Sequence, residues 1–227
     1  MEFLYCEDAS NLQPLLKDFD IDEKTIINKG DIVSFNNKRL IQKHDMSLPY
    51  PLGVAVESHN EETMRFGRKT KIKVNISPNA VYKMTLPTIK FLEGSTDTTV
   101  KFQDRSAGYG EYGFADRYFM LVSKSDKSEN TDEIGTMRKC LCSLENDVYA
   151  VLQVEKGGVP HPDDVYVVIP NIGDRNIFQN DNHIATFEND EDSGLLCVGM
   201  TLDFNGAKKL PYCHVKFLKT FFTHSYN

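Results

Sequence analysis

One short segment of this chain places an imidazole beside two carboxylates. His161-Pro162-Asp163-Asp164 offers the groups that a general base and its orienting acid require, although catalysis needs them close in space and not only in sequence. Pro160 and Pro162 flank the histidine, and each proline restricts the backbone around it. This pattern is more typical of a rigid surface loop, so we assign no catalytic residue.

A second segment, residues 174–192, is rich in the oxygen ligands that calcium binds. Calcium takes about six to eight oxygens on a flexible backbone. The segment lacks the ligand spacing of an EF-hand loop, and solvated turns between strands are the simpler interpretation. Calcium binding stays open, and no metal ligand is assigned among Asp174, Asn176, Asn180, Asp181, Asn182, Glu188, Asp190, Glu191 and Asp192.

The cysteines do not predict a metal site or a disulfide framework. Their number is odd, and no signal sequence precedes them. Cys140 and Cys142 are separated by one residue, whereas zinc knuckles use two or more. Cys213 and His214 are adjacent, so on a strand they would point to opposite faces. We therefore expect buried, free thiols and no cofactor, for Cys6, Cys140, Cys142, Cys197 and Cys213.

Residues 107–114 alternate glycine with aromatic side chains. The segment precedes no predicted helix and lacks a Lys-Ser/Thr ending, so it is not a phosphate-binding loop. Glycines allow close backbone approach and the aromatic rings supply contact area, which favours a packed loop. Tyr109, Tyr112 and Phe114 could form a platform for a small ligand. Motifs of serine hydrolases, zinc proteases, P-loop proteins and dithiol enzymes are missing from the sequence.

Composition narrows the class of protein further. The 227 residues are 40% hydrophobic and 11% aromatic, which is enough apolar surface for a core. The net charge of −7 and the lack of a basic stripe argue against nucleic-acid binding. The N-terminus does not resemble a signal peptide, and no apolar run approaches the roughly 18 residues of a membrane helix. We expect a protein that is made in the cytoplasm and stays there or leaves by lysis.

Most of the chain shows the period-two pattern of strands. Residues 71–76 alternate most clearly, which places Ile72, Val74 and Ile76 inside and Lys71, Lys73 and Asn75 in water. Residues 118–122 and 165–169 are continuous apolar runs, which indicates strands covered on both faces. Many short strands with regular turns predict a mainly β fold, a barrel or a sandwich.

Two segments interrupt this pattern and suggest how the chain is divided. Residues 10–19 have the apolar spacing of a short helix, or of an extended arm that becomes ordered on a partner. Residues 123–136 are almost wholly polar, as in a linker or a mobile loop. The predicted parts are an arm or short helix at 1–28, a β-barrel-like domain at 29–122, a linker or loop at 123–136, and a second β lobe at 137–227.

Four segments carry a resemblance to a known family: Lys29-Gly30-Asp31-Ile32-Val33-Ser34-Phe35, then Pro51-Leu52-Gly53-Val54-Ala55-Val56, then Lys71-Ile72-Lys73-Val74-Asn75-Ile76, then Val81-Tyr82. Over residues 29–86 the chain resembles the small capsid cement (decoration) proteins of tailed bacteriophages. The resemblance implies a β-barrel that sits on the outside of the head, often as a trimer, without catalytic residues. The polar stretch 57–71 and the whole C-terminal part depart from the family pattern.

The sequence therefore predicts a non-enzymatic virion protein, assembled in the host cytoplasm, that binds its own copies and a major capsid protein. The residues expected to grip a partner are the apolar ones that precede the β pattern, namely Phe3, Leu4, Leu12, Leu15, Leu16 and Phe19. Three alternatives stay open. They are a tail or baseplate component, a carbohydrate- or small-ligand-binding β module that uses the aromatic platform, and an enzyme with a dispersed site.

Overall fold

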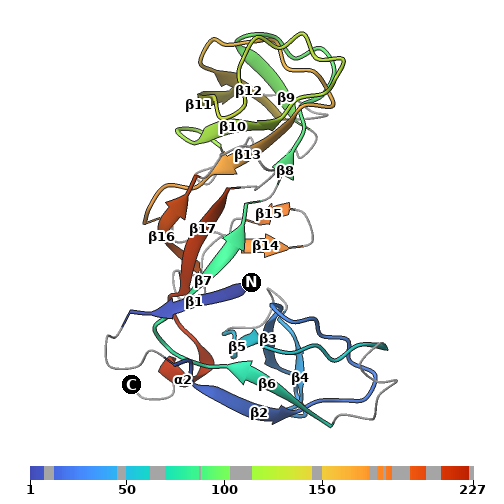
Figure 1. Cartoon of the computed structure of the whole chain (residues 1–227), viewed down its shortest axis with the longest axis vertical. Coiled ribbons are helices and arrows are strands. Elements are labelled where there is room, and N and C mark those ends of the chain that lie inside the picture. Colours follow the sequence, from blue (N-terminus) through green and yellow to red (C-terminus); the bar gives the residue numbers. More distant parts are fainter. Residues whose placement is uncertain are drawn as a thin grey trace.

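The fold of the chain is mainly β, as predicted, and three antiparallel sheets make up most of it (Figure 1). The computed structural model describes residues 1–7, 13–44, 50–61, 70–86, 88–102, 114–144, 150–173, 178–180, 183–185, 195–202 and 211–224. The sheets are stacked along the longest axis of an elongated molecule, so they form three tiers. Each tier has its own hydrophobic core.

The five-stranded tier contains three of the four segments that carry the family resemblance. Its strand order is β2-β6-β5-β3-β4, with β2 at Leu16–Asp20, β3 at Ile32–Phe35, β4 at Ile41–Lys43, β5 at Gly53–Ala55 and β6 at Lys71–Asn75. A parallel bridge between Ile21 and Ile41 brings the two edges of this sheet together. The sheet therefore curls around its core, although the described residues do not form a closed barrel.

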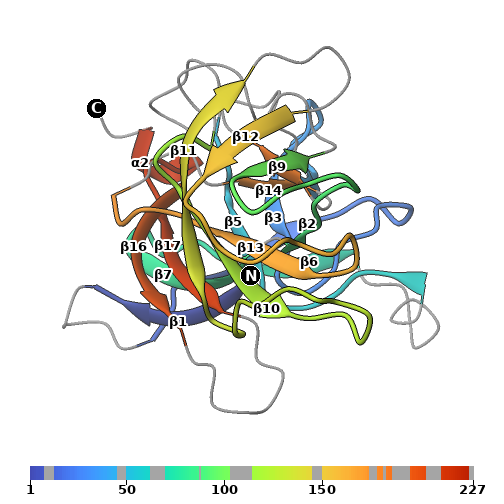
Figure 2. The ribbon, with the colours of Figure 1, turned by 90° about the horizontal axis from the view of Figure 1, so that it is seen from above.

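The six-stranded tier has the order β8-β13-β10-β11-β12-β9. Its strands are β8 at Thr88–Ile89, β9 at Thr99–Phe102, β10 at Tyr118–Ser123, β11 at Met137–Leu144, β12 at Ala150–Val154 and β13 at Val165–Ile169. The Leu92 N–H donates to the Lys101 carbonyl at 2.8 Å, which links the segment after β8 to β9. This sheet is also curled, and in the view from above it lies in front of the other two sheets (Figure 2).

The four-stranded tier lies between the other two. Its order is β1-β7-β17-β16, with β1 at Glu2–Cys6, β7 at Ala80–Thr85, β16 at Leu195–Thr201 and β17 at Tyr212–Phe217. Its core includes Tyr82 of its own sheet, Val54 of the five-stranded sheet, and Met120 and Val167 of the six-stranded sheet. A hairpin of β14 (Phe178–Asn180) and β15 (His183–Ala185) and the short helix α2 (Phe221–His224) complete the described elements.

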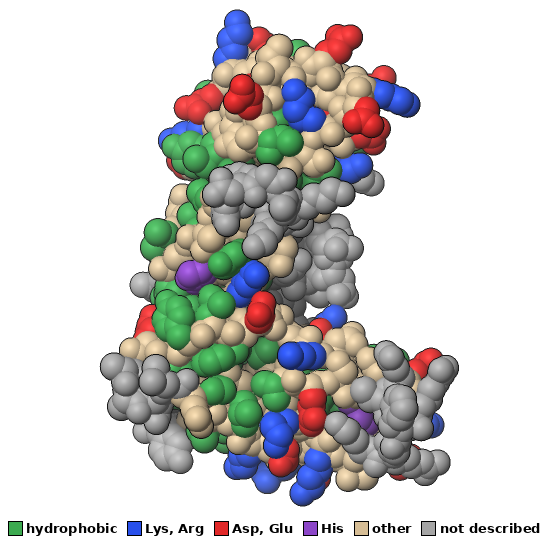
Figure 3. All heavy atoms as spheres, in the orientation of Figure 1, with side chains coloured by type: hydrophobic (Ala, Val, Ile, Leu, Met, Phe, Trp, Pro, Cys, Tyr) green, Lys and Arg blue, Asp and Glu red, His purple; other side chains and the backbone are tan. Residues whose placement is uncertain are grey.

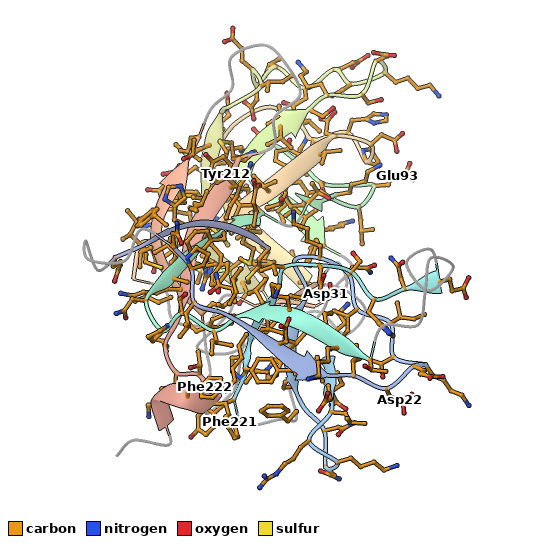
Figure 4. All side chains as sticks on the ribbon, turned by 60° about the horizontal axis from the view of Figure 1, so that its bottom comes forward. Asp22, Asp31, Glu93, Tyr212, Phe221 and Phe222 are labelled. Carbon is orange, nitrogen blue, oxygen red and sulfur yellow. The ribbon has the colours of Figure 1, made fainter. Side chains whose placement is uncertain are left out.

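The helix α2 ties the end of the described chain back to the five-stranded tier. The Phe221 N–H donates to the Pro51 carbonyl at 2.9 Å, and the Phe221 ring packs edge-on against Phe35 with centroids 5.2 Å apart. The ring centroids of Phe222 and Phe19 are 6.4 Å apart, so both rings of α2 pack against this sheet (Figure 4). No helix among the described residues is long and apolar enough to cross a membrane.

The two continuous apolar runs form strands that are buried on both faces, which confirms the prediction. In β10, Phe119 and Leu121 face the core of the six-stranded tier while Met120 faces the middle core. The same division holds in β13, where Tyr166 and Val167 belong to different cores. A strand between two cores has no polar face, and this is why these segments show no alternation.

The clean alternation of β6 is confirmed for its apolar side and wrong at one polar position. Ile72 and Val74 are 1% and 0% exposed, as predicted. Asn75 was expected in water but is 0% exposed. Its cross-strand partner Val54 belongs to the middle core, so this face of the sheet is covered by that core. The Asn75 Oδ1 accepts hydrogen bonds from the backbone N–H and the hydroxyl of Ser77, at 3.0 and 2.8 Å.

The predicted helix and the predicted division of the chain are both wrong within the described residues. Residues 16–20 form strand β2, because the outer edge of β6 presents backbone N–H and C=O groups that need partners and β2 pairs with that edge. The polar stretch 123–136 does not separate two lobes, since it joins β10 to β11 within one sheet. Strands from both predicted lobes also pair as β7 with β17 and β10 with β13.

Candidate interaction surface

The apolar residues predicted to grip a partner are divided between two sheets of the chain itself. Phe3 and Leu4 lie in β1, and the Phe3 ring packs edge-on against Tyr82 with centroids 6.2 Å apart. Phe19 lies in β2, and its ring packs edge-on against Phe35 with centroids 5.6 Å apart. Phe3 and Phe19 therefore pack against the protein's own cores, and Leu4 is held in the paired strand β1, so these residues do not form a free arm.

Two of the predicted contact residues keep exposed side chains. Leu15 and Leu16, at the start of β2, are 58% and 42% exposed. The Leu15 backbone is fixed, because its N–H donates to the Ser77 hydroxyl at 2.7 Å and its carbonyl accepts from Ile76 at 2.9 Å. These leucines remain available to a partner, whereas Leu12 lies outside the described residues.

The predicted aromatic platform is not supported at the one position that the structure describes. Phe114 is 5% exposed, and its ring contacts Phe102 and Phe119 with centroids 5.6 and 5.4 Å apart. It is therefore a core residue of the six-stranded tier. Tyr109 and Tyr112 lie outside the described residues.

The His161-Pro162-Asp163-Asp164 segment holds a structural carboxylate. Asp164 is 0% exposed. One carboxylate oxygen accepts from the Ser125 N–H at 3.0 Å, and the other accepts from the Ser128 hydroxyl at 2.8 Å and from the His161 N–H at 3.1 Å. Burial would raise the pKa of Asp164, but these hydrogen bonds outweigh it and hold the pKa below its ordinary value. The Asp164 carboxylate therefore holds the loops of Ser125 and His161 in fixed positions.

Asn130, from the polar stretch, completes this network. Its side-chain N–H groups donate to Asp164 at 3.1 Å and to the Tyr166 hydroxyl at 2.8 Å, and only 3% of the residue is exposed. Its Oδ1 accepts from the Asp132 N–H at 3.0 Å. Burial and the nearby Asp164 charge raise the pKa of Tyr166 to about 12, so Tyr166 stays a neutral partner. The polar stretch, predicted to be a linker or a mobile loop, is therefore buried and hydrogen-bonded at Asn130.

A second buried charge, Arg138, binds three backbone carbonyl oxygens from two neighbouring segments. Its Nε donates to the Glu155 carbonyl at 3.1 Å, its Nη1 to the Gly158 carbonyl at 2.9 Å, and its Nη2 to the Asp97 carbonyl. The guanidinium also lies 3.9 Å from the Asp132 carboxylate. A guanidinium presents five donors in a rigid fork, so one side chain can hold several loops in fixed positions.

The two glycines beside this network are required by close approach. A Cβ atom on Gly157 would lie 2.6 Å from the Arg138 Nε. A Cβ atom on Gly158 would lie 2.0 Å from the Asn130 Oδ1 and 2.7 Å from the Thr131 backbone nitrogen. The Gly157-Gly158 pair therefore lets one loop lie directly against the other.

We call the two segments held in this way the locked loops, residues 124–136 and 155–164. They lie beside each other at one side of the six-stranded tier (Figure 2). Each presents one aliphatic side chain to solvent: Ile134 is 54% exposed and Val159 is 55% exposed. Met137, where β11 begins, is 46% exposed. A fixed backbone with exposed aliphatic side chains is suited to binding another protein, because little ordering remains to be done on contact.

Sequence reasoning missed this surface, although one signal was present. Arg138 and Cys140 occupy the inward positions of β11, and an arginine at an inward position indicates a buried polar network. The acidic and basic side chains of this tier are interspersed on the face shown in Figure 3. Among the described residues, no group of three or more His, Cys, Asp or Glu side chains could hold a metal ion.

Comparison with known protein families, with curated proteins and with solved structures found no significant match to this chain.

Proposed function

We propose that this chain is a non-enzymatic structural protein of a tailed-phage virion, most specifically an auxiliary decoration protein that binds the capsid lattice. The observation that carries the binding role is the pair of locked loops. Two buried charged side chains, Asp164 and Arg138, hold these loops through hydrogen bonds, while Ile134 and Val159 stay exposed. Buried charges are costly to desolvate, so their use at an exposed pair of loops favours a surface whose shape must be preserved.

The assignment to the capsid rests on the resemblance over residues 29–86. Its strands β3, β5 and β6 are direct neighbours in one curled sheet, which is compatible with the small barrel of the decoration proteins. The fourth segment, Val81-Tyr82, lies instead in β7 of the middle sheet. The chain beyond residue 86, outside the resemblance, supplies β10 to β13 and hence the locked loops.

Immunogold labelling tests the proposal directly. An antibody against the purified full chain would be applied to particles released from cultures that carry its gene. Gold on the heads, at many sites per particle, is the expected result. Gold confined to tails would contradict the decoration role and assign the chain to the tail or baseplate, and unlabelled particles would overturn the virion assignment.

A matched pair of variants tests whether the locked loops make the contact. Ile134→Ser and Val159→Ser should each weaken binding of the chain to particles about tenfold, since an exposed aliphatic residue at a binding centre contributes on the order of 1–2 kcal/mol. Ile26→Ser is the control, because Ile26 is also 54% exposed but belongs to the five-stranded tier. Equal affinity of all four proteins in a co-sedimentation assay would contradict this surface.

A further inference from the structure

Two of the five cysteines lie together inside the middle core. Cys197 is in β16 and Cys213 is in β17, and these strands pair with each other. Cys197 lies opposite Val215, so Cys213 is its diagonal neighbour on the same inner face. Both residues are 0% exposed. The pairing, and not the spacing in sequence, brings the two residues together.

The two thiols are neighbours in this core, and Cys197 raises the pKa of Cys213. Each also reaches a carbonyl oxygen, Cys197 that of Gly199 at 3.4 Å and Cys213 that of Met84 at 3.6 Å. A bulge between Cys197 and Gly199 shifts the register of the strands beside this contact. The other close pair differs, since Cys140 is buried in the core of the six-stranded tier while Cys142 contacts the Gln153 side chain on its outer side.

Reduced thiols are stable in this environment. The neighbouring Cys197 thiol, together with burial, raises the pKa of the Cys213 thiol, so little reactive thiolate forms in the folded chain. An oxidant must also enter a fully buried site, which requires the β16–β17 pair to open locally. Oxidation is therefore slow in the folded protein and faster whenever these strands separate.

We propose that Cys197 and Cys213 are a latent disulfide pair that closes when the chain meets a peroxide outside a reducing compartment. The first thiol, as its thiolate, attacks the O–O bond of hydrogen peroxide and becomes a sulfenic acid, with release of one water. The second thiol attacks that sulfur, the S–S bond forms, and a second water leaves. Two thiol hydrogens and two electrons pass to one peroxide in total.

The bond would join β16 to β17 across the connection formed by residues 198–212. Closing this loop restricts the unfolded chain and stabilises the middle tier, which contacts both other sheets. The chemistry does not depend on the proposed function. Only the biological timing of the oxidation, after lysis releases the chain from a reducing cytoplasm, rests on the proposed function.

Peptide mapping after oxidation tests the inference. The full chain would be treated with hydrogen peroxide, alone and at a urea concentration that opens the native state transiently, and then digested without reduction. The expected product is a cross-linked peptide pair containing residues 197 and 213, formed faster with urea and removed by a phosphine reductant. The thermal midpoint of the oxidised chain should rise by roughly 5–10 °C.

Variants separate this pair from the other thiols. Cys197→Ala and Cys213→Ala should each abolish the cross-link and the rise in midpoint, whereas Cys140→Ala, at an equally buried position, should change neither. If an alanine variant does not fold, the wild-type peptide map alone still decides the question. Separate sulfinic acids at residues 197 and 213, or a disulfide between any other two cysteines, would overturn the proposal.

Discussion

Asp164 and Arg138 show how single residues fix the candidate surface. Each is a charged side chain in a buried position, and each has its hydrogen-bonding capacity largely met by backbone groups and neutral side chains of neighbouring loops. A buried charge that loses its partners is strongly destabilising, whereas a satisfied one can hold a conformation in place. Small substitutions at either residue should therefore have large effects on the stability of the protein.

Asp164→Asn should destabilise the protein by about 2–4 kcal/mol, because the amide group replaces an acceptor with a donor among groups that already donate. Urea unfolding of the purified variant measures the change. Asp163→Asn is the matched control, since Asp163 is exposed and its ion pair with Lys90, at 3.5 Å, contributes little. A loss below about 0.5 kcal/mol for Asp164→Asn would contradict the described network.

The depressed pKa of Asp164 also predicts a pH dependence. A carboxyl group whose pKa is lower in the folded state binds fewer protons there than in the unfolded chain. Its contribution to stability is therefore present above the unfolded pKa, near 3.8, and is lost as the pH falls through the lower folded value. The thermal midpoint, measured from pH 7 to pH 2, should fall more steeply below pH 4 in the wild type than in Asp164→Asn. Parallel curves of thermal midpoint against pH for the two proteins would contradict the lowered pKa of Asp164.

At the scale of the element, most strands are defined by which of the three cores their faces meet. β6 meets the five-stranded core with Ile72 and Val74 and turns Lys71 and Lys73 away from it. β10 and β13 have apolar residues on both faces because they lie between two cores. The helical spacing within residues 10–19 was misleading, since among the described residues of this segment Leu15 and Leu16 are exposed while Phe19 contacts a core.

Val74→Asp should prevent folding, because Val74 is 0% exposed and an unpaired carboxylate in the core is very costly. Circular dichroism and the yield of soluble protein measure the outcome. Lys71→Gln, three residues earlier in the same strand and facing water, should leave the thermal midpoint nearly unchanged. An unchanged midpoint in Val74→Asp would show that the burial of this strand is wrong.

At the scale of the molecule, the three tiers depend on one another. The middle core takes residues from all three sheets, and α2 returns from the middle sheet to the five-stranded one. The N-terminal twenty residues contribute an edge strand to two different tiers, with Phe3 and Phe19 packed inward. The described residues of this segment are thus part of the folded body.

Deletion of residues 1–20 should unfold the chain or lower its thermal midpoint severely, since two strands and two core aromatic residues are lost together. Each large aromatic residue alone contributes roughly 3–5 kcal/mol in a core. Calorimetry of the truncated protein measures the change. The double variant Leu15→Ser, Leu16→Ser is the control and should remain folded, because both side chains are exposed. A stable, well-folded truncation would restore the interpretation of the segment as an arm.

The sequence by itself determined the β class, the inward residues of β6 and the doubly covered strands β10 and β13, because the period of hydrophobic residues is a local property of a strand. Only the tertiary structure decided which strands pair, since antiparallel partners such as β7 and β17 lie far apart in the chain. It also decided the burial of Asn75, the locked loops and the contact of Cys197 with Cys213. A polar or sulfur-containing side chain looks the same in sequence whether water or a distant segment satisfies it, so its role follows from the neighbours that the fold supplies.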